Sequence, residues 1–224
     1  MKTAAGESIP EQRRRQIFEA ASEVFGRKGY ASASVRDIAD AAGMPVPTMY
    51  QYCRSKEDIL SMVFDTYMRE LGGSVQAAGS VQGTPAKRMK NAVSASLSMH
   101  DKYRHQIKLM FQETGSLGPQ NRARVLQTTR SANEIWAELI REGNKTGDFN
   151  VGSPALVANF IPIVAASWVL RRWNMDGATL AEMHDALEQF VMHGLSGPPR
   201  SGAQRQTTKR AAKKFVRAKR ADAR

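Results

Sequence analysis

Two short helical patterns joined by a glycine turn, within residues 34–60, constrain the fold of this chain more than any other feature. Ser34 and Ser55 each stand three residues before an aspartate, a spacing at which the serine hydroxyl accepts hydrogen bonds from the unpaired N–H groups of a helix start. Gly43 can adopt the left-handed conformation that ends a helix, so a sharp turn and a new helix are expected near Pro45. This layout predicts a helix-turn-helix.

The helix expected from Val46 to Tyr52 carries more polar and aromatic side chains than a buried helix needs. The major groove of DNA, about 12 Å wide, admits an α-helix whose first residues touch base edges, while hydroxyls and cations hold the phosphates. Tyr50, Tyr52 and Lys56 are placed for such phosphate contacts. Either tyrosine alone could equally pack in the core of a small three-helix domain, but the group as a whole favours DNA binding.

Residues 11–60 resemble the N-terminal domain of TetR-type (TetR/AcrR) transcriptional regulators, which is similar to the three-helix arrangement of homeodomains. The match rests on an apolar stripe in the first helix, on the Gly29-Tyr30 end of that helix, on the segment Ser34 to Gly43, and on the run Tyr50-Gln-Tyr-Cys-Arg-Ser-Lys-Glu, which follows the family's Tyr-x-x-Phe-x-Ser-Lys-Glu. The stripe consists of Ile17, Ala20, Ala21 and Phe25.

The resemblance implies a one-component, ligand-responsive repressor whose third helix enters the major groove. The DNA contacts that it implies are Ser34, Val35, Arg36, Pro45, Val46, Pro47, Thr48, Tyr50, Gln51, Tyr52 and Lys56. Auxiliary DNA contacts are expected from cations near the two ends of the chain, namely Arg13, Arg14, Arg15, Lys209, Arg210, Lys213 and Lys214. The cluster at Arg13 could equally be a solvated helix start.

The chain departs from the family pattern at three positions. Pro45 and Pro47 replace a serine and a glycine; the first helical turn tolerates proline, because its N–H groups have no partner within the helix, but two phosphate donors are lost. Base contacts then shift towards Val46 and Thr48. Cys53, the only cysteine, replaces a phenylalanine and excludes an intrachain disulfide. We expect it to be a small buried side chain; an oxidation sensor is the alternative.

The positive charge of the chain is concentrated at its C-terminal end. The net charge is +12, and residues 198–224 contain ten Lys or Arg against one Asp. This tail starts with glycine and proline and has no buried-face pattern, so disorder in solution is expected, with helix formation on a phosphate backbone. A solubilising tail or the attachment of an acidic partner are the alternatives.

Helical periodicity continues after Lys56, and no segment of β-alternation is evident. We expect an all-α fold of about nine helices, with a flexible arm at residues 1–9, a helix-turn-helix DNA-binding domain at 10–56, a helical-bundle ligand-binding and dimerisation domain at 57–196, and a basic disordered tail at 197–224. Within the larger domain the pattern predicts a polar loop from Gly72 to Pro85 and two late apolar helices, Pro154 to Asn174 and Leu180 to Leu195.

The first of these late helices is apolar on more than one face, which a monomer cannot bury completely. In proteins of this resemblance the last two helices form the homodimer interface, which suits a palindromic double-stranded operator. The expected interface residues are Leu156, Ile163, Leu180, Met183, Leu187, Phe190 and Val191. Pro162 should kink the first helix, since it removes a backbone hydrogen bond.

A small-molecule effector is expected in a cavity among the central helices. Its candidate residues are Met110, Phe111, Glu113, Trp136, Leu139, Phe160, Val164 and Trp168, although each taken alone is more often a core residue. The segment from residue 107 to 117 resembles the sixth helix of family members that sense acyl-CoA thioesters. The resemblance therefore predicts an acyl-CoA effector.

Two other functions are weighed against a regulator. An enzyme is disfavoured because the four histidines form no metal-binding pair and no serine lies in a nucleophile-elbow sequence, and no cofactor or metal is expected. A nonspecific architectural DNA-binding protein could use the basic tail, but would show little sequence preference and no ligand response. The N-terminus lacks an apolar signal region and no apolar run reaches membrane-span length, so we expect a cytoplasmic, nucleoid-associated bacterial protein without membrane contact.

Overall fold

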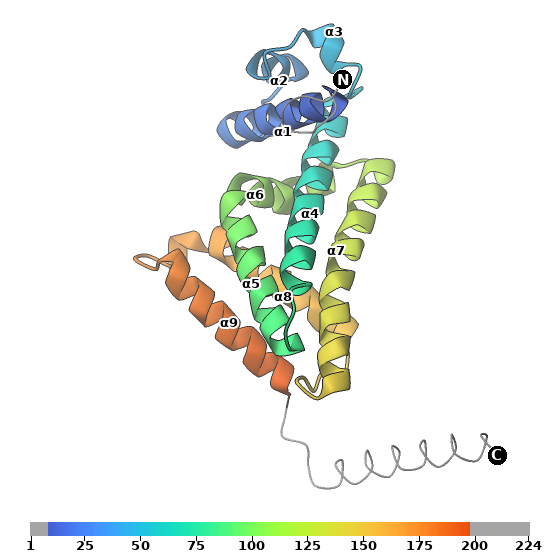
Figure 1. Cartoon of the computed structure of the whole chain (residues 1–224). Helices are drawn as coiled ribbons and strands as arrows, with labels where there is room; N and C mark the ends of the chain where they lie inside the picture. Colours follow the sequence, from blue (N-terminus) through green and yellow to red (C-terminus); the bar gives the residue numbers. More distant parts are fainter. Residues whose placement is uncertain (1–8, 198–224) are drawn as a thin grey trace, which may run out of the picture.

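The computed structural model describes residues 9–197, and this part of the chain is built from helices without strands (Figure 1). The α-helices are α1 (Ile9–Lys28), α2 (Val35–Ala41), α3 (Val46–Met49), α4 (Lys56–Gly79), α5 (Pro85–Lys102), α6 (Arg104–Glu113), α7 (Pro119–Thr146), α8 (Pro154–Leu170) and α9 (Leu180–Ser196). Two 3-10 turns, Thr114–Ser116 and Arg172–Asn174, follow α6 and α8. The all-α prediction is confirmed. The rest of the expected arm and basic tail, with Lys209, Arg210, Lys213 and Lys214, lies outside the described residues, while Ile9, expected in the arm, begins α1.

Side-chain caps start α2 and α4 as the serine spacing predicts. Ser34 forms a reciprocal capping box: its Oγ accepts from the Asp37 N–H at 3.1 Å, and its own N–H donates to Asp37 Oδ2 at 2.9 Å. Ser55 Oγ accepts from the Asp58 N–H at 3.1 Å, but the Asp58 carboxylate accepts from the N–H of Arg54 instead. Both helix starts therefore lie where they were expected.

The predicted loop from Gly72 to Pro85 is wrong at its beginning, because α4 continues through Gly72 to Gly79. A Cβ at Gly72 would lie 3.6 Å from Ala132 Cβ, and one at Gly79 would lie 3.0 Å from Leu139 Cδ1, both on α7. These glycines do not end α4. Because they have no side chain, they allow α4 and α7 to approach each other closely. The pattern of glycine alone does not distinguish the two uses.

The helices form two parts joined by α4 (Figure 1). The helices α1, α2 and α3 gather around the N-terminal end of α4, whose remaining length packs between α5 and α7. The helix α8 contacts α5 and α7, and α9 lies along α5. Pro162 lies inside α8, as expected. In the described residues no helix is both long enough and apolar enough to span a membrane.

Candidate nucleic-acid interface and ligand cavity

The eleven residues that the resemblance assigns to DNA contact are all accessible, while the residues between them form the core of the small domain. Ser34, Arg36, Pro45, Pro47, Tyr50 and Gln51 are exposed, and Val35, Val46, Thr48, Tyr52 and Lys56 are half-buried. Ile38, Ala39 and Met49 are buried beneath them. The helix α3 ends at Met49, earlier than expected, and Tyr50 to Tyr52 form turns after it. The short helix therefore presents its N-terminal residues and the following turn to the outside.

Lys56 is engaged within the chain. Its Nζ donates to the carbonyl oxygens of Tyr30 at 2.8 Å and Ala31 at 3.0 Å, and lies 4.6 Å from the centre of the Tyr30 ring. These contacts fasten the connection between α1 and α2 to the first turn of α4. Two of the three N–H donors of the ammonium group are used in this way. Local residue spacing does not reveal this structural role, because Tyr30 and Ala31 lie 26 and 25 residues before Lys56.

Asp37 links the capping box to the end of α1. Its Oδ1 accepts from Lys28 Nζ at 2.6 Å. The hydrogen bond from Lys28 and then those from Ser34 lower the pKa of Asp37 to about 2. The carboxylate is therefore charged at neutral pH and acts as a helix-start anchor in the part of the domain expected to face DNA.

Cys53 is buried, with its Sγ 3.3 Å from the carbonyl oxygen of Met49. Burial, and secondarily the nearby Asp58 carboxylate, raise the pKa of the thiol to about 11. The thiol is protonated at neutral pH and poorly suited to oxidation sensing, because the thiolate is the reactive form. The geometry favours the small buried side chain over the sensor.

Hydrogen bonds tie the start of α4 to the start of α7. Glu57 Oε1 accepts from the Gly118 N–H at 2.9 Å and from Asn121 Nδ2 at 2.8 Å. Further along both helices, Arg124 Nε pairs with Asp65 Oδ2 at 2.8 Å. The segment between α6 and α7 is thereby held against the base of the helix-turn-helix domain. A displacement of α6 or α7 would reach α4 through these bonds.

An apolar cavity of about 190 Å³ lies among α4, α5, α6, α7 and α8. Its lining residues are Tyr67, Met68, Leu71, His100, Ile107, Met110, Phe111, Thr129, Asn133, Asn159, Pro162, Ile163 and Ala166. The lining contains no Asp, Glu, Lys or Arg. Burial lowers the pKa of His100 and so favours its neutral form, while hydrogen bonding to the backbone at Ser96 and Pro162 acts in the opposite direction. The cavity suits a ligand or a ligand portion without charge.

Only two of the eight residues expected to line the cavity, Met110 and Phe111, do so. The other six lie elsewhere. Trp136 and Leu139 are buried in the core, Val164 is half-buried, and Phe160 is 62% exposed. The Glu113 carboxylate accepts a hydrogen bond from Ser116 Oγ, and Trp168 Nε1 donates one to Asp101 Oδ1. Helical spacing cannot separate a cavity wall from solid core, because both require apolar side chains. Pro162 does border the cavity, where its kink was expected to open space.

Of the residues expected in the dimer interface, some are exposed in the single chain and others are buried. Leu156, Ile163 and Phe190 are 65%, 55% and 63% exposed, and Phe160 joins them at 62%. Leu180 is exposed to a lesser degree and Met183 is half-buried. Leu187 and Val191 are wrongly placed in the predicted interface, because they are buried within the protomer on the side of α9 that packs on α5. A large apolar area of α8 and α9 is nevertheless left uncovered in the single chain.

Comparison with known proteins agrees with this geometry. The family model described as bacterial regulatory proteins, tetR family, matches residues 17–63, and the model described as Tetracyclin repressor-like, C-terminal domain, matches residues 82–195. The regulator HbdR of Aromatoleum sp. (strain CIB) is 29% identical over 179 residues, which cover 78% of this chain and 76% of HbdR. The activator FasR of Mycolicibacterium smegmatis is 27% identical over 198 residues, covering 87% and 88%, and the repressor KstR2 of the same species is 26% identical over 176 residues, covering 78% and 85%.

Solved structures show the same fold. A tetR-family regulatory protein from Rhodococcus RHA1 superposes with a TM-score of 0.72 at 21% identity, covering 84% of this chain and 98% of that one. The regulator FadR of Bacillus subtilis, solved in complex with stearoyl-CoA, superposes with a TM-score of 0.69 at 21% identity, covering 83% and 99%. The two family models together match most of the described chain. The protein belongs to the TetR family, and it is a DNA-binding, ligand-responsive transcriptional regulator, not an enzyme or an architectural protein.

Proposed function

We propose that the protein is a homodimeric repressor that leaves a palindromic operator when a small molecule with an apolar chain enters the cavity beside α4. The observation that carries this proposal is the position of the cavity: three of its lining residues, Tyr67, Met68 and Leu71, belong to the helix whose other end holds the helix-turn-helix domain. The repressors KstR2 and DhaR among the relatives support the direction of control.

In the proposed complex α3 enters the major groove, with Val46 and Thr48 against base edges and with Ser34, Tyr50 and Tyr52 against phosphates. These five side chains are exposed or half-buried, which supports this assignment. A dimer presents two such helices, and both reach successive major grooves only when they lie roughly 34–36 Å apart. A small rotation of each α4 is then enough to end specific binding.

Release of the operator requires that the effector bind one arrangement of the dimer more tightly than the other. An effector that fits the cavity better when α6 and α7 are displaced shifts the population towards that arrangement. The bonds from Glu57 to Gly118 and Asn121, and from Asp65 to Arg124, carry the displacement to α4. Effector binding and operator binding therefore favour different positions of α4, and each weakens the other.

The proposed effector is an acyl thioester of coenzyme A. The walls of the cavity are largely apolar and contain no Asp, Glu, Lys or Arg, as an acyl chain requires. The stearoyl-CoA bound to B. subtilis FadR supports the same class. Of the residues predicted from the sequence, Met110 and Phe111 are the ones we keep as effector contacts.

A gel-shift titration tests the proposal, using the DNA upstream of the protein's own gene, a scrambled control DNA and a panel of acyl-CoA thioesters. Wild-type protein should prefer the upstream DNA and release it with one thioester. Met110→Trp should fill the cavity and abolish release while operator binding persists. Lys108→Trp, an exposed position on the same helix, is the matched control and should respond normally. Equal binding to both DNAs, or release from Met110→Trp, would refute the proposal.

A further inference from the structure

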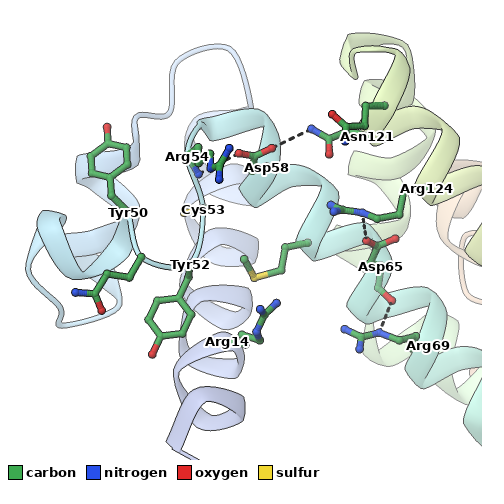
Figure 2. A pocket seen from close by; sticks show the side chains of 13 residues that line it. Arg14, Tyr50, Tyr52, Cys53, Arg54, Asp58, Asp65, Arg69, Asn121 and Arg124 are labelled. Carbon is green, nitrogen blue, oxygen red and sulfur yellow. Dashed lines mark hydrogen bonds and ion pairs between the residues drawn. The ribbon is translucent and has the colours of Figure 1, made fainter.

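A second hollow lies at the junction between the helix-turn-helix domain and the helices behind it. This junction cleft has a volume of about 400 Å³ and shares no lining residue with the apolar cavity. Its lining residues are Arg14, Tyr50, Gln51, Tyr52, Cys53, Arg54, Asp58, Met62, Asp65, Arg69, Gln120, Asn121 and Arg124. Figure 2 shows that these side chains come from α1, from the turn after α3, from α4 and from α7. The cleft is therefore bordered by both parts of the protein.

The junction cleft is rich in unbalanced positive charge. Four arginines and two aspartates line it, which leaves two positive charges in excess. The Arg124 guanidinium is held in place, with Nε 2.8 Å from Asp65 Oδ2 and one terminal nitrogen 2.6 Å from Ser61 Oγ. Among the residues that the structure describes, the guanidinium groups of Arg14 and Arg54 have no hydrogen-bond or ion-pair partner. The cleft thus combines a fixed cation with two that are free to bind a ligand.

Guanidinium groups bind phosphate with paired N–H donors, and the amides of Gln51 and Gln120 add neutral donors. The Asn121 amide donates to Glu57 and Asp58 instead. The volume lies within the range of small-molecule sites, roughly 300–1,000 Å³. We propose that the junction cleft binds a small phosphorylated anion, between pyrophosphate and a nucleotide in size.

The DNA backbone is the competing source of phosphate, and the geometry disfavours it. Arg69 comes thirteen residues after Lys56 on α4, which places it about 20 Å further along the helix at 1.5 Å per residue. Asp65, the partner of Arg124, lies about 14 Å along by the same rise. A duplex lying across α3 and the start of α4 does not reach these two arginines. All four arginines line the one cleft, so a small anion bound there lies in the field of all of them.

Such an anion would contact α1, the turn after α3 and α7 together. It would restrain the helix-turn-helix domain against the larger domain at the point where Glu57 and Asn121 already join them. The protein would then respond to two chemically different signals, an apolar one in the cavity and a phosphorylated one in the junction cleft. The second site does not depend on the identity of the first effector.

Isothermal titration calorimetry of the full chain with sodium pyrophosphate, without DNA and at constant ionic strength, tests this site. The wild type should bind one pyrophosphate per chain in a saturable step. The double variant Arg14→Gln/Arg54→Gln should weaken that step by about tenfold or more. Neither side chain has a partner within the described residues, so its unfolding midpoint should not change. Arg69→Gln should also weaken binding.

The matched control is Arg122→Gln/Arg130→Gln, which removes two exposed arginines of α7 that do not line the cleft. It loses the same charge and should bind pyrophosphate normally. Any heat of pyrophosphate binding to the basic residues after position 197 is the same in all variants, so it cancels when the variants are compared. Absence of a saturable step, or equal weakening in the control, would overturn the proposal. Loss of operator affinity in Arg14→Gln/Arg54→Gln without pyrophosphate binding to the wild type would assign the cleft to DNA instead.

Discussion

The helix-turn-helix domain and the helices behind it are held by contacts of different range. In the first, the helix starts are fixed by bonds between residues three apart, as in the Ser34 and Ser55 caps, and the longest bonds described above, from Lys56 to Tyr30 and Ala31, span 26 and 25 residues. In the second, bonds join residues more than sixty apart, as between Glu57 and Gly118 or Lys90 and Glu188. A domain fixed locally can move as a rigid body, whereas the helices that move it depend on long-range packing. This division suits a protein whose DNA-reading part must be displaced without being unfolded.

The largest expected effect that separates the two domains concerns the apolar surface that the larger domain leaves exposed. Phe160→Arg/Phe190→Arg places charge on the exposed apolar area of α8 and α9 and should weaken the proposed dimer by about 4 kcal/mol, roughly a thousandfold. Sedimentation velocity across a dilution series measures this. Leu126→Arg, an exposed apolar residue of α7, is the control and should leave association unchanged. A wild-type chain that remains monomeric at high concentration would contradict the assignment.

The next effect concerns packing inside the larger domain. A Cβ at Gly143 would lie 1.9 Å from Cδ2 of the buried Phe149 ring. Gly143→Ala should therefore lower the free energy of unfolding by about 3 kcal/mol, because the ring has no free space to enter. The matched control is Gly73→Ala in α4, where a Cβ meets nothing within 4 Å, and which should stabilise by roughly 0.5–1 kcal/mol. Chemical denaturation followed by circular dichroism separates the two signs.

The same contrast explains which features were predictable from the sequence. The caps, the Gly43 turn and the exposed residues of α2 and α3 follow from neighbours in the chain, and the positive φ of Gly43, 61°, agrees with the predicted turn. The uses of Gly72, Leu187 and Trp136 depend on which helix lies opposite, and periodicity carries no such information. The role of Lys56 is intermediate: its position was predicted, but its bonds to Tyr30 and Ala31 require the folded domain.

A smaller effect distinguishes contact with DNA from support of the domain. Tyr50 is 51% exposed, and Tyr50→Ala should weaken operator binding by about tenfold without changing stability. Lys56→Ala should weaken operator binding and also lower the unfolding midpoint, since it removes two hydrogen bonds that hold the α1–α2 connection. Fluorescence anisotropy and thermal melts on both variants, with dimerisation monitored, make the comparison. Lost stability in Tyr50→Ala, or unchanged stability in Lys56→Ala, would reverse the two roles.

The smallest effect is a pH dependence confined to the local bonds of the first domain. Hydrogen bonds from Lys28 and Ser34 lower the pKa of Asp37 from 3.8 to about 2 in the folded protein. Because the folded pKa lies below the unfolded one, this group contributes stability that is fully present above about pH 4 and is lost as the pH falls towards about 2. Asp37→Asn should be less stable than the wild type at pH 7, and the difference should shrink between pH 4 and pH 2. Urea denaturation at matched ionic strength measures it, with Asp40→Asn, an exposed aspartate of the same helix, as the control. A stability difference between Asp37→Asn and wild type that stays constant down to pH 2 would mean that the charge of the carboxylate is not what stabilises the capping box.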